Sequence, residues 1–211
     1  MNFCVKNIKN GNRSFIKQLI KGEAEKSEEN LQDIYQYGEL KVLVKGFFLL
    51  DNDTKKLYDY IKSKHKNINI VIVNSNFVFG IEHIFGILKI INEEIKRKEV
   101  REIRKLDIEF LLRICYTNQI SNALEILKEN KNNNVVCIVF SKYLSHIERV
   151  NADLRNHGKE DNSLIQYSDD KKLQIIKLFF KKELKNSDIF IMKDGHKFQK
   201  FLIERAAIVL R

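Results

Sequence analysis

Two kinds of hydrophobic pattern alternate along the chain. Short runs that are continuously apolar, or that alternate with polar residues, are typical of strands, and they occur at residues 40–50, 69–73 and 135–140. The second and third runs are rich in β-branched side chains with no polar interruption, as in strands that are covered on both faces. The sequence therefore predicts three core strands of a buried sheet.

Apolar residues spaced three and four apart predict helices between these strands. The first helix is expected at residues 54–64, with Asp53 or Thr54 as its N-cap. The longest apolar stripe runs from Ile81 to Ile95 and is expected to face the core. Both helices would cover the predicted sheet.

Two further helices are expected to pack as a hairpin. Asp107 is predicted to cap the first and Thr117 to begin the second. The inner residues expected for the first are Phe110, Leu111 and Ile114. Those expected for the second are Ile120, Ala123, Leu124 and Leu127.

The C-terminal third is less regular. Residues 151–172 are polar and mixed in charge, with His157-Gly158 as a predicted turn, and are interpreted as a surface excursion. A helix is expected at residues 173–184. The final apolar run, residues 203–210, is compatible with a helix by propensity and with a strand by its β-branched Ile208-Val209. No repeat or Gly/Ser-rich linker interrupts the chain, so residues 1–211 are expected to form a single domain.

The composition favours a polyanionic partner. The chain has 38 Lys and Arg against 28 Asp and Glu, a formal net charge of +10, and basic side chains that meet phosphates gain free energy by releasing counterions. Nucleic acid is thus the leading partner class. The alternative is that Lys enrichment reflects genome composition or a hot environment.

Other composition features exclude several classes of protein. The three cysteines, Cys4, Cys115 and Cys137, lie far apart among apolar residues, so they form no disulfide framework or C-x-x-C motif and are expected to be buried. No apolar span approaches the roughly 20 residues of a membrane helix, and residues 1–10 lack a continuous apolar core. We expect a cytoplasmic protein without a membrane partner.

Two groups of basic residues are candidate contacts for RNA phosphates. The second, less favoured group is Lys181, Lys182 and Lys185. The first group links two predicted helices and comprises Lys96, Arg97, Lys98, Arg101, Arg104 and Lys105. The alternative for the first is a solvated face, because Glu99, Glu102 and Asp107 lie among these residues and can pair with them.

Polar residues near two predicted helix starts are candidate contacts for unpaired bases, which are recognised by stacking and by hydrogen bonds to their edges. Arg113, Thr117, Asn118 and Gln119 supply donors and acceptors at one start, and His83 lies near the strand-to-helix turn at the other. The alternative is that Thr117 is only an N-cap, that Asn118 and Gln119 are first-turn residues, and that His83 is a helix residue with local partners.

A protein partner would need exposed apolar side chains. The aromatic residues that the predicted core stripes account for least are Phe77, Phe79, Phe198 and Phe201. They are the candidate contacts, and burial in the core is the alternative for at least half of them.

No catalytic motif is visible. The five histidines lack metal-ligand spacing, and the chain has no phosphate-binding loop, dinucleotide fingerprint or nucleophile elbow. We therefore expect a non-enzyme without cofactor or metal. The enzymatic alternative is a metal-dependent nuclease that acts on RNA through Glu82, Asp107, Glu109 and Lys105, and a third possibility is a scaffold that binds only protein.

An ordered set of segments resembles a known family. The set comprises the apolar strand, Gly80-Ile81-Glu82-His83, the basic linker, Leu106 to Ile114, Asn118-Gln119-Ile120 with Ala123, and Ile203-Glu204-Arg205-Ala206-Ala207-Ile208. Together these resemble the small subunit of the KEOPS complex, called the PRPK-binding protein in animals, over about the C-terminal two-thirds of the chain. The family usually has small residues at the positions of Cys115-Tyr116, and a Gly where this chain has Glu129-Asn130.

The resemblance implies an α/β (α+β) single domain with a mixed, mostly antiparallel sheet flanked by helices. It implies a non-catalytic subunit of the complex that makes threonylcarbamoyladenosine in tRNA. Such a subunit binds and stimulates an atypical kinase/ATPase, and in archaeal members it holds the 3′ CCA end of tRNA. Contact with the other KEOPS subunits would be indirect, through the kinase.

Overall fold

The structure is a computed structural model of the chain, and it describes residues 6–7, 33–97, 105–129, 132–181 and 194–210. Six strands of these residues form one sheet in the order β1-β2-β3-β5-β4, with β6 beside β3. Every strand pairing within the described residues is antiparallel. The strands are β1 (Lys6–Asn7), β2 (Ile34–Tyr37), β3 (Leu40–Leu49), β4 (Asn69–Asn74), β5 (Asn134–Ser141) and β6 (Gly158–Glu160).

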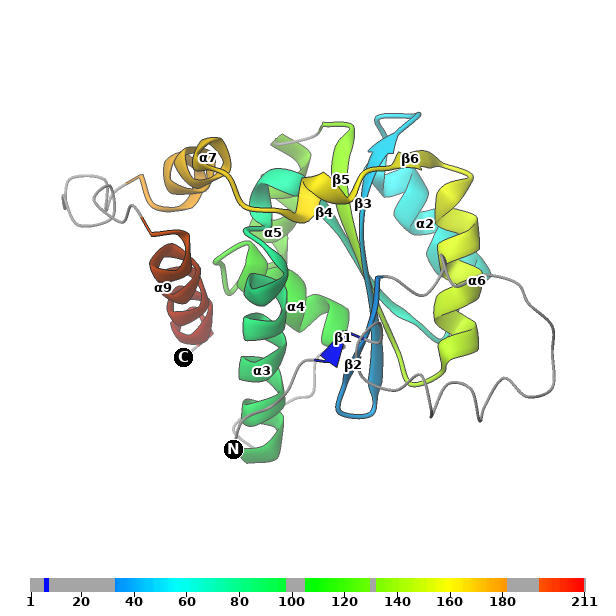
Figure 1. The fold of residues 1–211 in the computed structure, drawn as a ribbon, viewed down its shortest axis with the longest axis horizontal. Helices are drawn as coiled ribbons and strands as arrows, with labels where there is room; N and C mark the ends of the chain where they lie inside the picture. Colours follow the sequence, from blue (N-terminus) through cyan, green and yellow to red (C-terminus); the bar gives the residue numbers. More distant parts are fainter. Residues whose placement is uncertain (1–5, 8–32, 98–104, 130–131, 182–193, 211) are drawn as a thin grey trace.

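Helices cover both faces of this sheet (Figure 1). α2 and α6 lie on one face, α3, α4 and α5 on the other, and α7 and α9 form a further layer outside α3. The α-helices are α2 (Thr54–Lys64), α3 (Ile81–Arg97), α4 (Leu106–Ile114), α5 (Ile120–Glu129), α6 (Leu144–Arg155), α7 (Asp169–Phe179) and α9 (Gly195–Ile208). Two 3-10 helices, η2 (Ser75–Phe77) and η3 (Asn162–Ile165), connect them. The described residues thus form one compact α+β domain.

The alternation of side chains along a strand explains the two main cores. On β3, Val42 and Val44 face α3 and α4, whereas Leu43 and Phe47 face α2 and α6. β4 and β5 are apolar at almost every position because both of their faces are covered. The three core strands expected from the sequence are confirmed.

One edge of β3 is shared by two short strands. β2 pairs with residues 40–43, and β6 pairs with residues 47–49. Between these two segments, Gly46 contacts the irregular chain that follows β6. The Gly46 carbonyl accepts from the Asp161 N–H at 2.9 Å, and the Gly46 N–H donates to Oδ1 of Asn162 at 3.2 Å. Lys45 also lies between the two paired segments of β3. Its side chain is buried and forms ion pairs with Asp33 at 3.3 Å and Glu160 at 2.6 Å.

A third apolar cluster holds α7 and α9 to the rest of the domain. It consists of Phe79, Ile175, Ile176, Phe180, Phe198 and Leu202. α9 also approaches α3 closely, because a Cβ at Gly86 would lie 2.4 Å from Cδ1 of Ile203. The outer layer is therefore fixed against α3 by both features.

Two predicted helices are confirmed closely. α2 spans the expected residues, and Oδ1 of Asp53 accepts from the Lys56 N–H at 3.0 Å, as an N-cap does. α3 buries Ile84, Leu88 and Ile91 of the predicted stripe. No described helix is both long enough and apolar enough to span a membrane.

The predicted caps of the helical hairpin need correction. The N-cap position of α4 is Lys105, whose side chain forms no capping bond. Asp107 lies in the first turn instead, where its buried carboxylate forms an ion pair with Lys62 of α2 at 3.1 Å. α5 begins at Ile120, and of its four expected inner residues only Ala123 is buried.

The C-terminal third is more regular than predicted. Residues 151–172 are not a surface excursion, because they contain the end of α6, β6, η3 and the start of α7. α6 was missed because Asn151 and Asp153 are polar yet buried, which hides the stripe of Ile147, Val150 and Leu154. α7 begins at Asp169 rather than Leu173, and the final apolar run belongs to helix α9. Residues 182–184 of the predicted helix lie outside the described residues.

Candidate nucleic-acid interface

The connection from α4 to α5, residues 115–119, carries three of the predicted site residues, and we call it the α4–α5 junction. α4 ends with the Tyr116 N–H donating to the Arg113 carbonyl at 3.2 Å and the Thr117 N–H donating to the Leu112 carbonyl at 3.0 Å. These two bonds define a Schellman motif, whose penultimate residue takes a left-handed conformation and is usually Gly. Here that residue is Tyr116, at φ 49°, and it is the one non-glycine residue with positive φ in the described part of the chain.

The Tyr116 side chain joins the α4–α5 junction to the start of α3. Its hydroxyl lies 3.0 Å from Nε2 of His83, and its ring centroid lies 5.0 Å from those of both Phe179 and Phe180 at the end of α7. Burial, with a smaller contribution from Cys115, raises the pKa of Tyr116 well above its ordinary value. The hydroxyl is therefore neutral and acts as a hydrogen-bonding group.

His83 is a buried neutral histidine. Its Nδ1 accepts from the Phe79 N–H at 3.3 Å, so the neutral ring carries its proton on Nε2, which donates to the Tyr116 hydroxyl. Burial lowers the pKa of His83 to about 3. The side chain is fully buried, so it contacts Tyr116 inside the domain and does not offer a surface contact to RNA.

Three predicted contact residues follow Tyr116 in the α4–α5 junction. Oγ1 of Thr117 accepts from the Gln119 N–H at 3.3 Å, which agrees with a local capping role. The side chains of Asn118 and Gln119 are exposed. Together they present two amide groups, each with donors and an acceptor, beside the N-terminus of α5.

The next turns of α5 expose apolar residues that the sequence assigned to the inner face. Ile120 is 44% exposed and Leu124 is 54% exposed, and their spacing of four places them on one side of the helix. The stripe of α5 predicted an amphipathic helix correctly, but spacing alone does not tell which part of a stripe meets the core. α5 thus carries an apolar surface beside the exposed amides.

The basic residues of the first predicted group lie elsewhere. Lys96 and Arg97 are exposed at the C-terminal end of α3, and Lys105 is exposed just before α4. Arg97 is 14 residues beyond His83, which corresponds to about 21 Å along a helix. Lys98, Arg101 and Arg104 lie outside the described residues. The structure therefore separates the described members of this basic group from the α4–α5 junction.

Arg113 has a different role from the one predicted. Its side chain is 0% exposed, and its guanidinium donates to the Ala206 carbonyl at 2.7 Å and to the carboxylate of Glu94. These bonds join α4 to α9 and α3. The prediction of a surface contact at Arg113 is wrong for this structure, because the group is enclosed by three helices.

The predicted partner-binding aromatics are mostly core residues. Phe77, Phe79 and Phe198 are buried, with Phe79 and Phe198 in edge contact at 4.9 Å between ring centroids. Only Phe201 of the four keeps part of its surface, beside Phe180 and the guanidinium of Arg205. The exposed residues of α5 are thus better placed than Phe77, Phe79 and Phe198 to meet a protein.

The carboxylates of the nuclease alternative do not converge. Glu82 lies at the start of α3, where its carboxylate is 3.3 Å from Nε2 of Gln199. Asp107 lies in the first turn of α4, where it forms an ion pair with Lys62 of α2. Glu109 is buried on α4, and Lys105 precedes that helix. Within the residues that the structure describes, no three His, Cys, Asp or Glu side chains are grouped to hold a metal ion.

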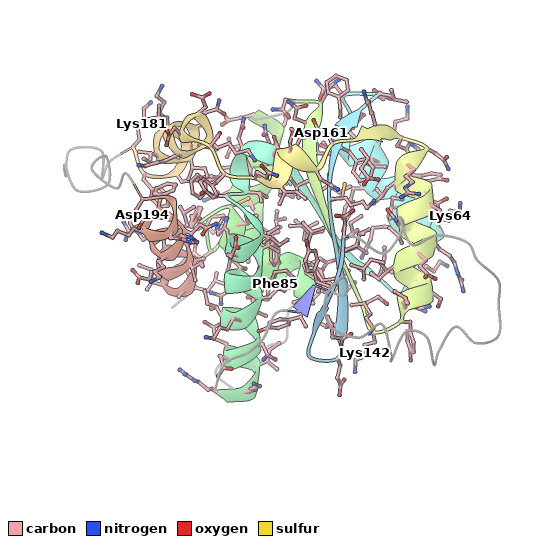
Figure 2. The ribbon with its side chains drawn as sticks, in the orientation of Figure 1. Lys64, Phe85, Lys142, Asp161, Lys181 and Asp194 are labelled. Atoms are coloured by element: carbon pink, nitrogen blue, oxygen red, sulfur yellow. The ribbon has the colours of Figure 1, made fainter. Side chains whose placement is uncertain are left out.

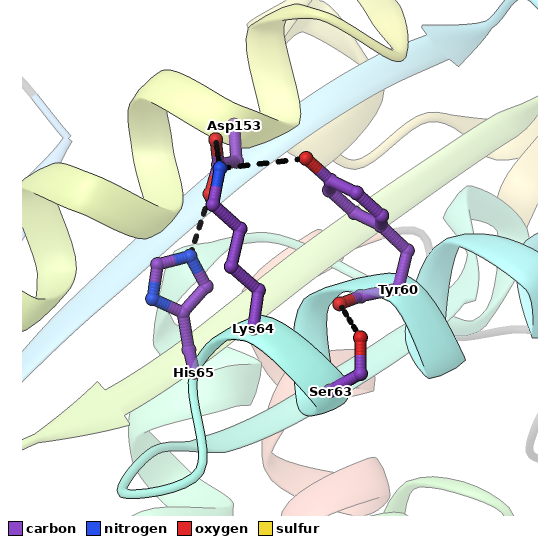
Figure 3. Close-up of polar contacts among 5 residues, drawn as sticks. All are labelled: Tyr60, Ser63, Lys64, His65 and Asp153. Atoms are coloured by element: carbon purple, nitrogen blue, oxygen red, sulfur yellow. Dashed lines mark hydrogen bonds and ion pairs between the residues drawn. The ribbon is translucent and has the colours of Figure 1, made fainter.

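A second polar cluster joins α2 to α6 on the opposite face of the sheet (Figure 3). Asp153 accepts from Nζ of Lys64 at 2.7 Å and from Nε2 of His65 at 2.6 Å. Burial raises the pKa of the Asp153 carboxyl, but these two bonds outweigh it and hold the pKa below its ordinary value. No local pattern in the sequence indicates this cluster, since Asp153 is 88 and 89 residues away from its two partners.

Comparisons with models of protein families and with curated proteins find no match to this chain.

Proposed function

We propose that this protein is a non-catalytic subunit of a KEOPS-type complex, which makes threonylcarbamoyladenosine in tRNA. It binds the atypical kinase/ATPase of that complex, stimulates it, and recruits tRNA through the unpaired 3′ CCA end. It acts in the cytoplasm and meets the other subunits through the kinase. The proposal rests on the ordered motif segments that resemble the PRPK-binding protein family.

One observation supports the proposal most. Two segments of the resemblance, Gly80-Ile81-Glu82-His83 and Asn118-Gln119-Ile120, lie near each other, because His83 contacts Tyr116 at 3.0 Å and Tyr116 is two residues before Asn118. Tyr116 itself departs from the family pattern, so the support lies in the placement of the two segments and not in this contact. The second segment exposes uncharged amides at Asn118 and Gln119, which suit the edges of unpaired bases.

The kinase contact is proposed to include α5. Ile120 and Leu124 form an exposed apolar centre, and Asn118, Ser121 and Glu125 are exposed around it. An apolar centre inside a polar rim is the usual composition of a protein interface. RNA at the α4–α5 junction would then end next to the kinase.

The tRNA part is tested by binding measurements with intact tRNA and with the same tRNA lacking its 3′ CCA. We expect trimming to weaken binding at least tenfold, because stacking of unpaired bases contributes about 1–3 kcal/mol per base. Asn118→Ala with Gln119→Ala should remove most of the difference between the two RNAs. Equal affinity for intact and trimmed tRNA would contradict the proposal.

The kinase part is tested with the companion kinase from the same genome. We expect a stable complex on size-exclusion chromatography and an increase in ATP hydrolysis. Kinase binding without salt-dependent RNA affinity would favour the protein-only scaffold. Cleavage of tRNA in the presence of Mg²⁺, abolished by Asp107→Ala, would favour the nuclease instead.

A further inference from the structure

Lys181 is the one member of the second basic group within the described residues, and it lies next to the α4–α5 junction, whereas Lys182 and Lys185 lie outside the described residues. Tyr116 contacts the rings of Phe179 and Phe180 at 5.0 Å, and Lys181 follows directly. By contrast, Lys96 and Arg97 lie about 20 Å away at the other end of α3. An RNA strand whose 3′ end lies at the α4–α5 junction would therefore reach the end of α7 before it reached the first basic group.

The outer layer exposes four lysines without carboxylate partners. They are Lys177 and Lys181, at and just after the end of α7, and Lys197 and Lys200 on α9, and we call them the outer basic surface. None of the four forms an ion pair or hydrogen bond with its side chain in the described structure. Lys96, in the first group, forms an ion pair with Glu93 at 3.3 Å.

The described acidic residues of this layer form no ion pair with the four lysines. Asp169 and Asp170 lie in the first turn of α7, and Asp194 is the N-cap of α9, where carboxylates are favoured by the helix dipole. Glu204 is the one acidic residue beyond the first turns of α7 and α9. The C-terminal half of α7 and the first half of α9 are consequently cationic.

The outer layer is also firmly attached to the junction. Lys172 lies over the ring of Phe198 at 5.6 Å, and the Arg205 guanidinium lies 5.8 Å from the ring of Phe180. Phe180 in turn contacts both Tyr116 and Phe201. Lys181 and Asp194 lie on the flank of the molecule opposite to Lys64 (Figure 2), so this surface is separate from the α2–α6 face.

We propose that the outer basic surface binds the phosphate backbone of the tRNA strand whose 3′ end lies at the α4–α5 junction. Lys177 lies in the last turn of α7, and Lys181 lies two residues after the helix ends, so both ammonium groups are available to phosphates of one RNA strand. Such contacts add affinity and set the direction of the strand without reading its sequence. This inference rests on tRNA being the ligand, as proposed above.

Charge reversal tests the surface, measured by fluorescence anisotropy with full-length tRNA over a series of salt concentrations. The test variants are Lys177→Glu with Lys181→Glu, and Lys197→Glu with Lys200→Glu. The matched controls are Lys55→Glu with Lys66→Glu on the α2 face, where both residues are exposed, and Lys96→Glu with Arg97→Glu. All four double variants change the net charge by the same amount, so long-range electrostatics is equal among them.

Each test variant should weaken tRNA binding at least tenfold at low salt. Each should also lower the slope of log K against log salt by about 1.4–1.8, since each lost phosphate contact contributes about 0.7–0.9. The α2 control should change the slope by far less. Test variants that bind like the α2 control, or a loss of affinity only in the Lys96/Arg97 variant, would overturn the inference, as would a test variant that loses the kinase but keeps tRNA.

The same measurements with CCA-trimmed tRNA separate this inference from the proposed function. If trimming has no effect but the test variants still weaken binding, the outer surface is confirmed and the CCA role fails. If trimming matters but the test variants bind normally, the CCA role holds and the outer surface fails. Thermal unfolding followed by circular dichroism confirms that each variant is folded.

Discussion

The hydroxyl of Tyr116 accepts a hydrogen bond from Nε2 of His83 across 3.0 Å, and the two residues are 33 positions apart. A residue other than Gly in the left-handed conformation costs roughly 1 kcal/mol or more, so Tyr116 at φ 49° is a strained position. The ring compensates by packing between α3 and α7 while its hydroxyl satisfies a buried histidine. The Tyr116 side chain therefore stabilises the α4–α5 junction through contacts that a Gly at this position would not make.

Tyr116→Phe should lower the free energy of unfolding by about 1–3 kcal/mol, because it keeps the ring but leaves the buried Nε2–H of His83 without an acceptor. Urea unfolding at neutral pH measures the change. Tyr143→Phe is the matched control, since Tyr143 is 63% exposed and should change stability by less than about 0.5 kcal/mol. Equal effects of the two variants would show that the His83 contact contributes nothing.

Tyr116→Gly separates backbone strain from packing. Glycine removes the strain of about 1 kcal/mol at positive φ, but loss of this partly buried aromatic side chain costs about 3 kcal/mol, the lower end of the range for buried aromatic residues. The packing term is larger, so the glycine variant should be less stable than both the wild type and Tyr116→Phe. A variant as stable as wild type in urea would show that the ring contacts with Phe179 and Phe180 are dispensable.

Much of the framework was predictable because its causes are local. The apolar stripe of α3, the N-cap Asp53 of α2 and the apolar runs of β4 and β5 each depend on residues that are close in sequence. Arg113 shows where such reasoning ends. Its position near a predicted helix start suggested an exposed donor, yet its acceptor, the carbonyl of Ala206, is 93 residues away. No local pattern reveals that a later helix will cover it.

The candidate site was predictable in the same limited sense. Their polar side chains near predicted helix starts selected Asn118 and Gln119, which are exposed, but the same criterion selected His83, which is buried next to Tyr116. The contact between His83 and Tyr116 depends on how α3 and α4 pack, which residue spacing does not fix. The exposure of Leu124 likewise depends on how far α5 stands from the core. These features follow from tertiary packing and not from periodicity.

Gly46 should tolerate no side chain. A Cβ at this position would lie 2.1 Å from the Asp161 carbonyl oxygen and 2.9 Å from Cβ of Leu164, so the chain after β6 would have to move. Gly46→Ala is expected to destabilise the protein by more than about 2 kcal/mol, with loss of the bonds that Gly46 makes to Asp161 and Asn162. Urea or thermal unfolding measures the loss.

Gly38→Ala provides the contrast to Gly46→Ala. Gly38 has φ +58° but open space around its Cα, so an added methyl group meets only backbone strain of roughly 1 kcal/mol. The order of stability should be wild type, Gly38→Ala, then Gly46→Ala. The reverse order of the two variants would mean that the chain after β6 yields easily.

The Asp153 cluster should make stability depend on pH in the acid range. The folded-state pKa of Asp153 lies below the ordinary value of 3.8, so its ionised form stabilises the folded state above that pH, and this contribution is lost as the pH falls through the lower, folded value. Asp153→Asn should therefore lower the urea midpoint at pH 6. The difference from wild type should shrink below about pH 3.8. A difference that stays constant between pH 6 and pH 2 would contradict the ionic origin of the effect.

The exposed apolar residues of α5 should matter for binding more than for folding. Ile120 and Leu124 are each about half exposed, so Ile120→Ser with Leu124→Ser should change the free energy of unfolding by less than about 1 kcal/mol. If α5 docks the kinase, the same variant should weaken the complex at least tenfold, because apolar residues at an interface centre carry much of the binding energy. Leu173→Ser with Leu178→Ser on α7 removes similarly exposed leucines and should leave kinase affinity unchanged. Isothermal titration calorimetry with the purified kinase distinguishes the two surfaces, and a loss confined to the α7 variant would move the kinase contact to the outer layer.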